Sequence, residues 1–488
     1  MVKIFTFISI APLLINFCLF IQTMYAAEKQ IRPAAQADRF YPGNPDKLSE
    51  YLRAAFQSET IQPYDGNIIG IISPHAGYPY SGHVAANVYK HLERKKYTTV
   101  VVIAPSHTEA FEGATIYPGD SYETPLGNIP IQKDYANQII KETDVVSFSE
   151  KGHKAEHALE VQLPFLQMML QNFSLIPIVI GEQNLTVCRK LAQALAKVLP
   201  HDGVLLVASS DLSHYHSYKE ARELDNQIIN AVSNYDYTKI YQGVLSQQCE
   251  ACGMAPIITV MMAAQFMGAN DAYVTKFANS GDVPPGDKKQ VVGYMSAILG
   301  QKTKTASFLS PEEHKELLTI ARTAIETKLR KGKTFTPSTS SPNLQRSSGA
   351  FVTLSEKGNL RGCIGHIMTN EPLFKTVADA AISAAFSDPR FPQLSAKEYS
   401  AVQIEISVLG PLYCFQNVDD IEVGKHGLYI IYGNNSGLLL PQVATEYKWD
   451  RLTFLDETCR KAGLPQGTWK NPSATIFTFT AEVFGEEE

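Results

Sequence analysis

Short apolar runs rich in β-branched residues recur through the first 300 residues, with helical stretches between them. The runs at 68–72, 100–103 and 204–207 have the composition of strands that are buried on both faces. The stretches at 84–92 and 187–199 place apolar residues at helical spacing instead. This alternation predicts a three-layer α/β domain built on a parallel sheet.

The pattern changes beyond residue 300. Residues 301–311 are polar and lack periodicity, which indicates a linker. Ser310, Pro311 and Glu313 then follow the order of an N-cap, a first helical residue and a capping-box glutamate. Strands and helices beyond that helix do not alternate regularly, so we expect a second domain of the α+β class. The predicted parts are an N-terminal segment, an α/β domain, a linker and an α+β domain, at 1–27, 28–300, 301–311 and 312–488.

The N-terminal segment predicts export. Lys3 precedes an apolar stretch from Ile4 to about Ile21, and the small residues Ala26 and Ala27 follow. This order is typical of a secretory signal peptide. The apolar stretch is long for that role, which leaves an uncleaved membrane anchor as the alternative. In both cases we expect the body of the protein outside the cytoplasm, either periplasmic or extracellular, or anchored at its N-terminus.

The bulk composition describes a globular protein. The chain has 488 residues, 44% of them hydrophobic and 19% charged, which is enough for two or three domains. Its formal net charge of −6 gives no reason to expect nucleic acid as a partner.

The cysteines do not form the pattern of a disulfide framework. Six follow Cys18, which is few for a chain of this size. Cys249 and Cys252 form a C-x-x-C pair, whose interpretations include a disulfide, a redox pair and half of a zinc site. The sequence has no second C-x-x-C pair, which argues against a four-cysteine zinc site.

Each of the three strand-like runs is followed within a few residues by a histidine. These are His75, His107 and His214. Ligands of open α/β sheets bind beyond the carboxyl ends of the strands, so the three imidazoles can converge if the strands are neighbours. Imidazole is the commonest metal ligand in proteins and also titrates near neutrality. The pattern therefore predicts a metal or acid–base site.

We assign His75, His107 and Cys252 as metal ligands. Cys252 begins a predicted helix, where the N-terminal dipole is expected to lower the thiol pKa and favour the ligating thiolate. Two imidazoles and one thiolate leave coordination positions open, as in reactive rather than structural sites. Asp211 and His214 would lie across the crevice as an orienting carboxylate and an acid–base group.

Structural alternatives exist for each of these side chains. A histidine after a strand is commonly a loop residue that bonds to backbone, and Cys252 is also interpretable as a small buried hydrophobe or as a disulfide partner of Cys249. His157 either supports the metal ligands or binds substrate; the alternative is a solvated residue on a helix face. Tyr78 is a second candidate for a supporting position.

The second domain contains a cysteine close to two glycines. The segment Leu360-Arg361-Gly362-Cys363-Ile364-Gly365 predicts a tight turn in which backbone approaches another group closely. In a functional interpretation, Cys363 is an exposed nucleophile or ligand and Arg361 holds an anion. The alternative is a structural turn with a buried thiol.

The first domain is similar to the Memo family. The resemblance spans roughly residues 30–300 and rests on motifs in the family's order: Arg39-Phe40-Tyr41-Pro42, Pro74-His75-Ala76-Gly77-Tyr78, Pro105-Ser106-His107, Ser209-Ser210-Asp211-Leu212-Ser213-His214 and Cys252-Gly253. It implies a fold like that of class III extradiol dioxygenases, with His75, His107 and Cys252 at metal-binding positions and His214 at the acid–base position. Those dioxygenases have a carboxylate where this chain has Cys252. A thiolate shifts the preference towards copper(I), zinc or a differently poised iron.

The second domain resembles the AMMECR-type domain over about residues 308–485. The resemblance rests on the glycine–cysteine segment above together with Ser387-Asp388-Pro389-Arg390-Phe391-Pro392 and Leu440-Pro441-Gln442-Val443-Ala444. The chain thus looks like a fusion of two components of the AmmeMemoRadiSam system, which implies a radical SAM protein as a partner. An export signal fits poorly with a cytoplasmic partner of that kind.

The leading functional hypothesis is a metal-dependent redox enzyme. It would hold one metal ion, with iron or copper favoured and zinc possible, and act on a small molecule or peptide that the sequence does not identify. A non-catalytic protein that uses the same crevice to bind a metal or a partner is the main alternative, and metal-assisted hydrolysis is a third.

Overall fold

The computed structural model describes residues 29–486, apart from residues 94, 285, 303–308, 368, 370, 411, 415–416, 434 and 472–473. The predicted signal peptide or anchor, and most of the predicted linker, lie outside the described residues. Both therefore stay predictions. No helix within the described ranges combines the length and apolar character needed to cross a membrane.

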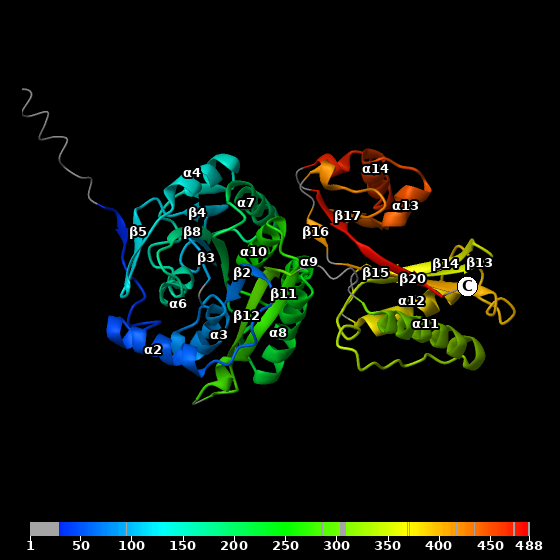
Figure 1. Ribbon diagram of the computed structural model, residues 1–488, viewed down its shortest axis with the longest axis horizontal. Coiled ribbons are helices and arrows are strands. Elements are labelled where there is room, and N and C mark those ends of the chain that lie inside the picture. Colours follow the sequence, from blue (N-terminus) through cyan, green and yellow to red (C-terminus); the bar gives the residue numbers. More distant parts are fainter. Residues whose placement is uncertain are drawn as a thin grey trace, which may run out of the picture.

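A nine-stranded sheet forms the centre of the first domain (Figure 1). The strand order is β10-β12-β2-β9-β3-β8-β4-β7, and β11 pairs with β12. The strands are β2 (Asn67–Ser73), β3 (Thr99–Pro105), β4 (Ala114–Ile116), β7 (Val146–Phe148), β8 (Ser174–Ile180), β9 (Val204–Ser209), β10 (His214–His216), β11 (Asp271–Asn279) and β12 (Val291–Gln301). A small side sheet holds β1 (Ile31–Arg32), β5 (Ser121–Thr124) and β6 (Gly127–Pro130).

The three predicted strands are neighbours at the middle of this sheet. β9 pairs in parallel with β2 on one side and with β3 on the other. Every residue of β3 is buried, as expected for a strand covered on both faces. The carboxyl ends of β2, β3 and β9 consequently lie side by side, which positions the loops that follow them.

Helices cover both faces of the sheet. Side chains alternate along β3, so that Val101 and Ile103 join the core under one group of helices while Val100 and Val102 join the core under the other. The first group includes α7 (Leu185–Val198) and α10 (Met254–Phe266), and the second includes α2 (Pro45–Ser58), α3 (Tyr78–Lys90) and α6 (Leu163–Met169). The remaining helices are α4 (Lys133–Glu142), α5 (His157–Glu160), α8 (Tyr218–Ser233) and α9 (Tyr237–Leu245).

The second domain is α+β, as predicted. Its first helix, α11 (Pro311–Lys331), begins at the predicted capping box of Ser310 and Glu313. One antiparallel sheet has the order β14-β13-β15-β20, and a second has the order β16-β19-β17-β18. The elements are β13 (Ala350–Glu356), β14 (Asn359–His366), α12 (Leu373–Phe386), β15 (Val402–Leu409), β16 (Tyr413–Cys414), β17 (Gly427–Tyr432), β18 (Asn435–Leu439), α13 (Pro441–Glu446), α14 (Arg451–Lys461), β19 (Thr475–Phe479) and β20 (Ala481–Gly485).

The two domains share part of one hydrophobic core. Tyr429, Phe477 and Phe479 of the second domain belong to the same buried cluster as the apolar residues of α10. The Nε2 amide of Gln265, at the end of α10, also donates to the carbonyl of Leu412 at 3.2 Å. Figure 1 shows β16 and β17 beside α9 and α10.

Candidate metal centre

The structure brings His75, His107 and Cys252 together. His75 follows β2, His107 follows β3 and Cys252 precedes α10, and their ligand atoms all lie within 4.8 Å of one another. The Nε2 atom of His75 lies 3.1 Å from Sγ of Cys252. This cluster of two imidazoles and a thiol is consistent with one metal ion.

The hydrogen bonds around His75 define which ring nitrogen carries the proton. The Ser209 hydroxyl donates to the carbonyl of Ala158 at 2.6 Å and accepts from the Nε2 amide of Gln162 at 2.8 Å. Since its only proton is used, Ser209 must accept from Nδ1 of His75, which lies 3.0 Å away. Nε2 of His75 therefore presents a lone pair to Cys252. Burial lowers the pKa of His75 to about 3, so the ring is neutral and ready to ligate.

Glu156 plays the same orienting role for His107. Its buried carboxylate accepts from the backbone N–H of His107 at 2.6 Å, from Nδ1 of the same residue at 2.9 Å and from the N–H of Ala158 at 2.9 Å. Burial acts to raise the pKa of Glu156, but the hydrogen bonds from His107 outweigh it and bring the pKa to about 2. A carboxylate that fixes the Nδ1–H tautomer leaves Nε2 free for a metal.

The expected low pKa of the Cys252 thiol is wrong. Cys252 lies two residues before α10, whose N-cap is Gly253, so it does not begin the helix. Burial, together with the Asp211 carboxylate nearby, raises the thiol pKa well above its usual range. Desolvation therefore outweighs the helix dipole in the metal-free protein. A coordinated cation would reverse this, since a ligating thiol loses its proton.

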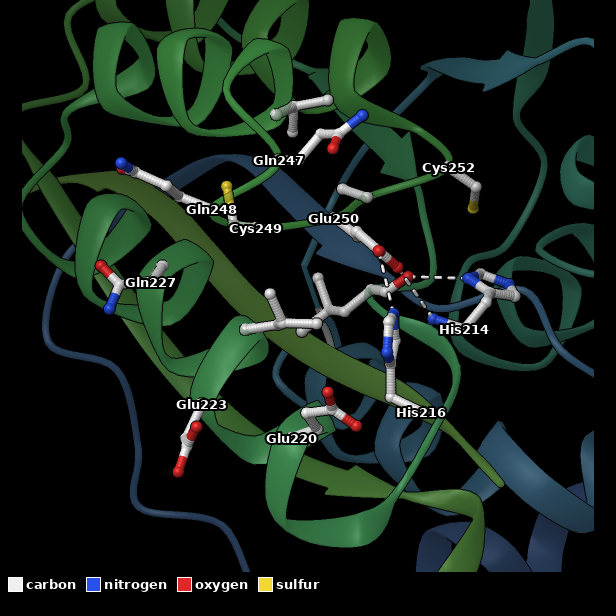
Figure 2. Close-up of a pocket in the computed structure, with 14 residues that line it drawn as sticks. His214, His216, Glu220, Glu223, Gln227, Gln247, Gln248, Cys249, Glu250 and Cys252 are labelled. Atoms are coloured by element: carbon white, nitrogen blue, oxygen red, sulfur yellow. Dashed lines mark hydrogen bonds and ion pairs between the residues drawn. The ribbon is translucent and has the colours of Figure 1, made fainter. Parts of the chain in front are cut away.

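The C-x-x-C pair is not a disulfide in this structure. Cys249 and Cys252 are both free thiols. Cys249 packs against α9, where a β-carbon added at Gly243 would lie 2.6 Å from its Sγ. Figure 2 shows the two sulfur atoms at opposite ends of the short segment that joins them. Only Cys252 faces the imidazole cluster.

Asp211 and His214 lie beside the cluster with different partners. The buried Asp211 carboxylate accepts from the backbone N–H of His75 at 2.7 Å, and burial raises the pKa of Asp211 to about 6. Nδ1 of His214 lies 2.8 Å from the carbonyl of Leu212, which can only accept. Nδ1 of His214 consequently carries the proton, and Nε2 is left as a base.

The two supporting candidates differ in position. His157 stacks on Phe40, with 4.4 Å between ring centroids, and its ring centroid lies 4.6 Å from that of His107 and 5.3 Å from that of His75. Tyr78 is buried, and its hydroxyl donates to the carbonyl of Val161 at 2.8 Å. His157 thus borders the cluster, whereas Tyr78 packs in the core below it.

A groove of about 1060 Å³ opens beside Cys252 and His214 (Figure 2). Its walls come from β10, α8 and the segment between α9 and α10, and they include His216, Glu223 and Glu250. A space of this size next to the cluster can hold a small organic molecule or part of a peptide.

Sequence inspection missed two acidic residues at this site. Glu156 is visible in the sequence only as the neighbour of His157, and Glu250 only as a residue between two cysteines. Their roles depend on contacts with residues distant in the chain, which no local pattern reveals.

The glycine–cysteine segment of the second domain lies within β14 and does not form the predicted tight turn. Gly362 permits close packing instead, because a β-carbon at this position would lie 2.2 Å from the carbonyl oxygen of Ala384 in α12. Nε of Arg361 donates to Glu398 at 3.0 Å, so this guanidinium already has a protein anion. The half-buried Cys363 accepts from the Thr353 hydroxyl at 3.3 Å, and its backbone N–H donates to Asp388 at 2.9 Å.

The fold and this cluster define a two-domain protein whose α/β part carries a candidate metal centre. The family model described as Memo-like protein matches residues 32–298, and the model described as AMMECR1 matches residues 318–484. The first match covers more than half of the chain, which therefore belongs to the Memo family, with an AMMECR1 domain fused behind it.

Similar proteins include MEMO1 family proteins of two archaea and one bacterium. The Methanosarcina barkeri protein is 38% identical over 272 residues, which are 55% of this chain and 100% of that protein. The Methanosarcina mazei and Thermotoga sp. (strain RQ2) proteins are 35% and 36% identical, each over 55% of this chain and 99% of the relative. A solved structure of an uncharacterized protein from Pyrococcus horikoshii is 40% identical, covers 37% of this chain and 94% of its own, and has a TM-score of 0.36.

Proposed function

We propose that this protein is a metal-dependent redox enzyme that holds one metal ion on His75, His107 and Cys252. The convergence of these three ligand atoms within 4.8 Å of one another carries the proposal. The substrate would be a small molecule or a peptide bound in the adjoining groove.

The donor set fits a metal ion on chemical grounds. Both imidazoles have Nδ1 committed to a hydrogen-bond acceptor, Ser209 for His75 and Glu156 for His107, which is the usual arrangement around metal-ligating histidines. Three protein ligands leave coordination positions for a substrate or water. The thiolate favours iron, copper(I) or zinc over magnesium or calcium. When bound, an iron or copper ion would supply electron transfer and Lewis acidity.

The protein's own residues supply positioning and proton transfer. His214 would remove or return a proton at Nε2, since its Nδ1 is held by the Leu212 carbonyl. Asp211 fixes the backbone of His75 and so the position of that ligand. His75, Ser209 and Asp211 are all buried, which keeps bulk water from one side of the cluster.

Turnover and metal content together test this function. The metal-loaded wild type should consume oxygen or a chemical reductant, and His214→Ala should abolish that turnover while keeping the metal. A non-catalytic metal carrier would show no turnover in the wild type. Hydrolysis without consumption of an oxidant or a reductant would replace the redox proposal with metal-assisted hydrolysis.

A further inference from the structure

Glu250 lies in the groove, two residues before Cys252, and bonds to the strand that carries His214. Its Oε1 accepts from Nε2 of His216 at 2.9 Å. Its Oε2 accepts from the backbone N–H of His214 at 3.3 Å. Figure 2 shows this carboxylate between the segment that leads to Cys252 and the two histidines.

The strand that Glu250 holds has an irregular backbone. Tyr215, between the two histidines, has a φ of +62°, which is rare for a bulky residue. The pairing of β10 with β12 also shifts register between His214 and His216. Both histidines line the groove, as residues two apart on a strand share a face, while Tyr215 is 70% exposed. Backbone strain of this kind persists only where surrounding contacts maintain it.

Other hydrogen bonds anchor this region and bring its two sides together. On the His214 side, the N–H of Ser213 donates to Asp225 at 3.0 Å. On the Cys252 side, the Nε2 amide of Gln183 donates to the carbonyl of Cys252 at 2.8 Å, and the N–H of Gly253 donates to the Ser210 hydroxyl at 2.9 Å. The Gly253–Ser210 bond and the Asp211 N–H, which donates to Sγ of Cys252 at 3.3 Å, join the Cys252 side to the segment before His214. Glu250 adds bonds that reach His214 and His216 themselves.

We infer that Glu250 is a positioning residue that couples the thiol ligand Cys252 to the acid–base residue His214. This inference rests on the proposed function. A metal ion bound by Cys252 would hold the segment that contains Glu250 in place. Glu250, through its hydrogen bonds, would then hold the backbone and ring of His214. By linkage, a strand held by Glu250 would in turn favour the metal-bound position of Cys252.

The test compares Glu250→Ala, Glu250→Gln and the matched control Glu223→Ala. The control removes another groove carboxylate, whose described ion pair is with Lys219 at 3.8 Å and not with β10. The glutamine variant removes the charge and keeps one acceptor oxygen, so it can accept from the His214 N–H or from the His216 ring but presents its NH2 group to the other. Zinc affinity is measured by competition with a chromophoric chelator, and the His214 imidazole is followed by ¹⁵N NMR with and without zinc.

We expect Glu250→Ala to weaken zinc binding about tenfold, as is usual when residues that support a ligand are lost. The same variant should abolish the shift of the His214 ring signals on zinc loading, while Glu250→Gln should fall between Glu250→Ala and the wild type, and Glu223→Ala should behave as the wild type. Equal behaviour of Glu250→Ala and Glu223→Ala in both measurements would overturn the inference.

A wild type that binds no metal would count against the proposed function without deciding the role of Glu250. In that case the metal-free NMR spectra decide it. The wild type should show the Nδ1-protonated tautomer of His214, and Glu250→Ala should show a mixture. Identical tautomers in the two proteins would overturn the inference.

Discussion

Binding of a metal ion at Cys252 should release about one proton, and the metal affinity should therefore rise with pH. The prediction depends on the environment that the fold gives the thiol. In the metal-free protein the half-buried thiol lies beside Asp211, and Nε2 of His75 lies 3.1 Å from its sulfur. A ligating thiol must give up that proton.

The magnitude follows from two ligands whose protonation the structure defines. Burial and the neighbouring Asp211 raise the pKa of Cys252 well above its usual range, so the free thiol keeps its proton at neutral and mildly alkaline pH. Burial lowers the pKa of His75 to about 3, so that imidazole has no proton to release. The free protein thus holds one proton more than the bound form. Affinity should rise about tenfold per pH unit, or roughly 100-fold between about pH 7 and pH 9.

Zinc titrations against a chromophoric chelator over that pH range measure the slope, after correction for the chelator's own protonation. Proton release is measured directly in weakly buffered solution with a pH indicator, and Cys252→Ser serves as the control that should release none. A flat affinity profile with no proton release from the wild type would refute the reasoning. It would show that the thiol is already ionised, as expected from a helix N-terminus alone.

Three further predictions concern single residues. Glu156→Gln replaces the carboxylate that accepts from the His107 ring by an amide, and should weaken metal binding about tenfold or more in the same titration. Unchanged affinity would show that Glu156 does not orient His107. Burial raises the pKa of Asp225 to about 6, above the unfolded value, so its ionisation destabilises the fold increasingly as pH rises from about 4 to 6. Asp225→Asn should therefore raise the free energy of unfolding at neutral pH by about 1 kcal/mol but not near pH 4, and urea titrations giving the same difference at both pH values would contradict this. Gly362→Ala places a β-carbon 2.2 Å from the Ala384 carbonyl oxygen and should lower the free energy of unfolding by about 1–3 kcal/mol. In thermal unfolding the control Gly485→Ala, where the nearest atom lies at 3.5 Å, should be nearly neutral. An equally small effect at Gly362 would rule out the close approach.

The parallel centre of the sheet and the two histidines beside it were predictable because both follow from local patterns and one topological rule. The edges of the sheet differ from the prediction of a parallel sheet, since β12 pairs antiparallel with β2 and β4 pairs antiparallel with β8. Continuous apolar runs identify strands buried on both faces, and β2, β3 and β9 are such strands. Histidines that follow neighbouring parallel strands must lie at one edge of the sheet. His75 and His107 meet there for that reason.

What the sequence did not predict depends on contacts between distant segments. The thiol pKa of Cys252 is set mainly by the desolvation of a half-buried side chain beside Asp211, which no stretch of sequence specifies. Gly362 was interpreted as a turn residue, but it is small in order to pack β14 on α12. Glu156 and Glu250 acquire their roles only from the positions of His107, His214 and His216.

Elemental analysis of protein purified without oxygen, with the wild type and Cys252→Ser side by side, tests the metal centre most directly. We predict about one equivalent of iron or copper in the wild type and its loss in the variant, as for a site with three protein ligands. Absence of metal from both proteins, even after loading with iron, copper and zinc, would contradict the metalloenzyme account.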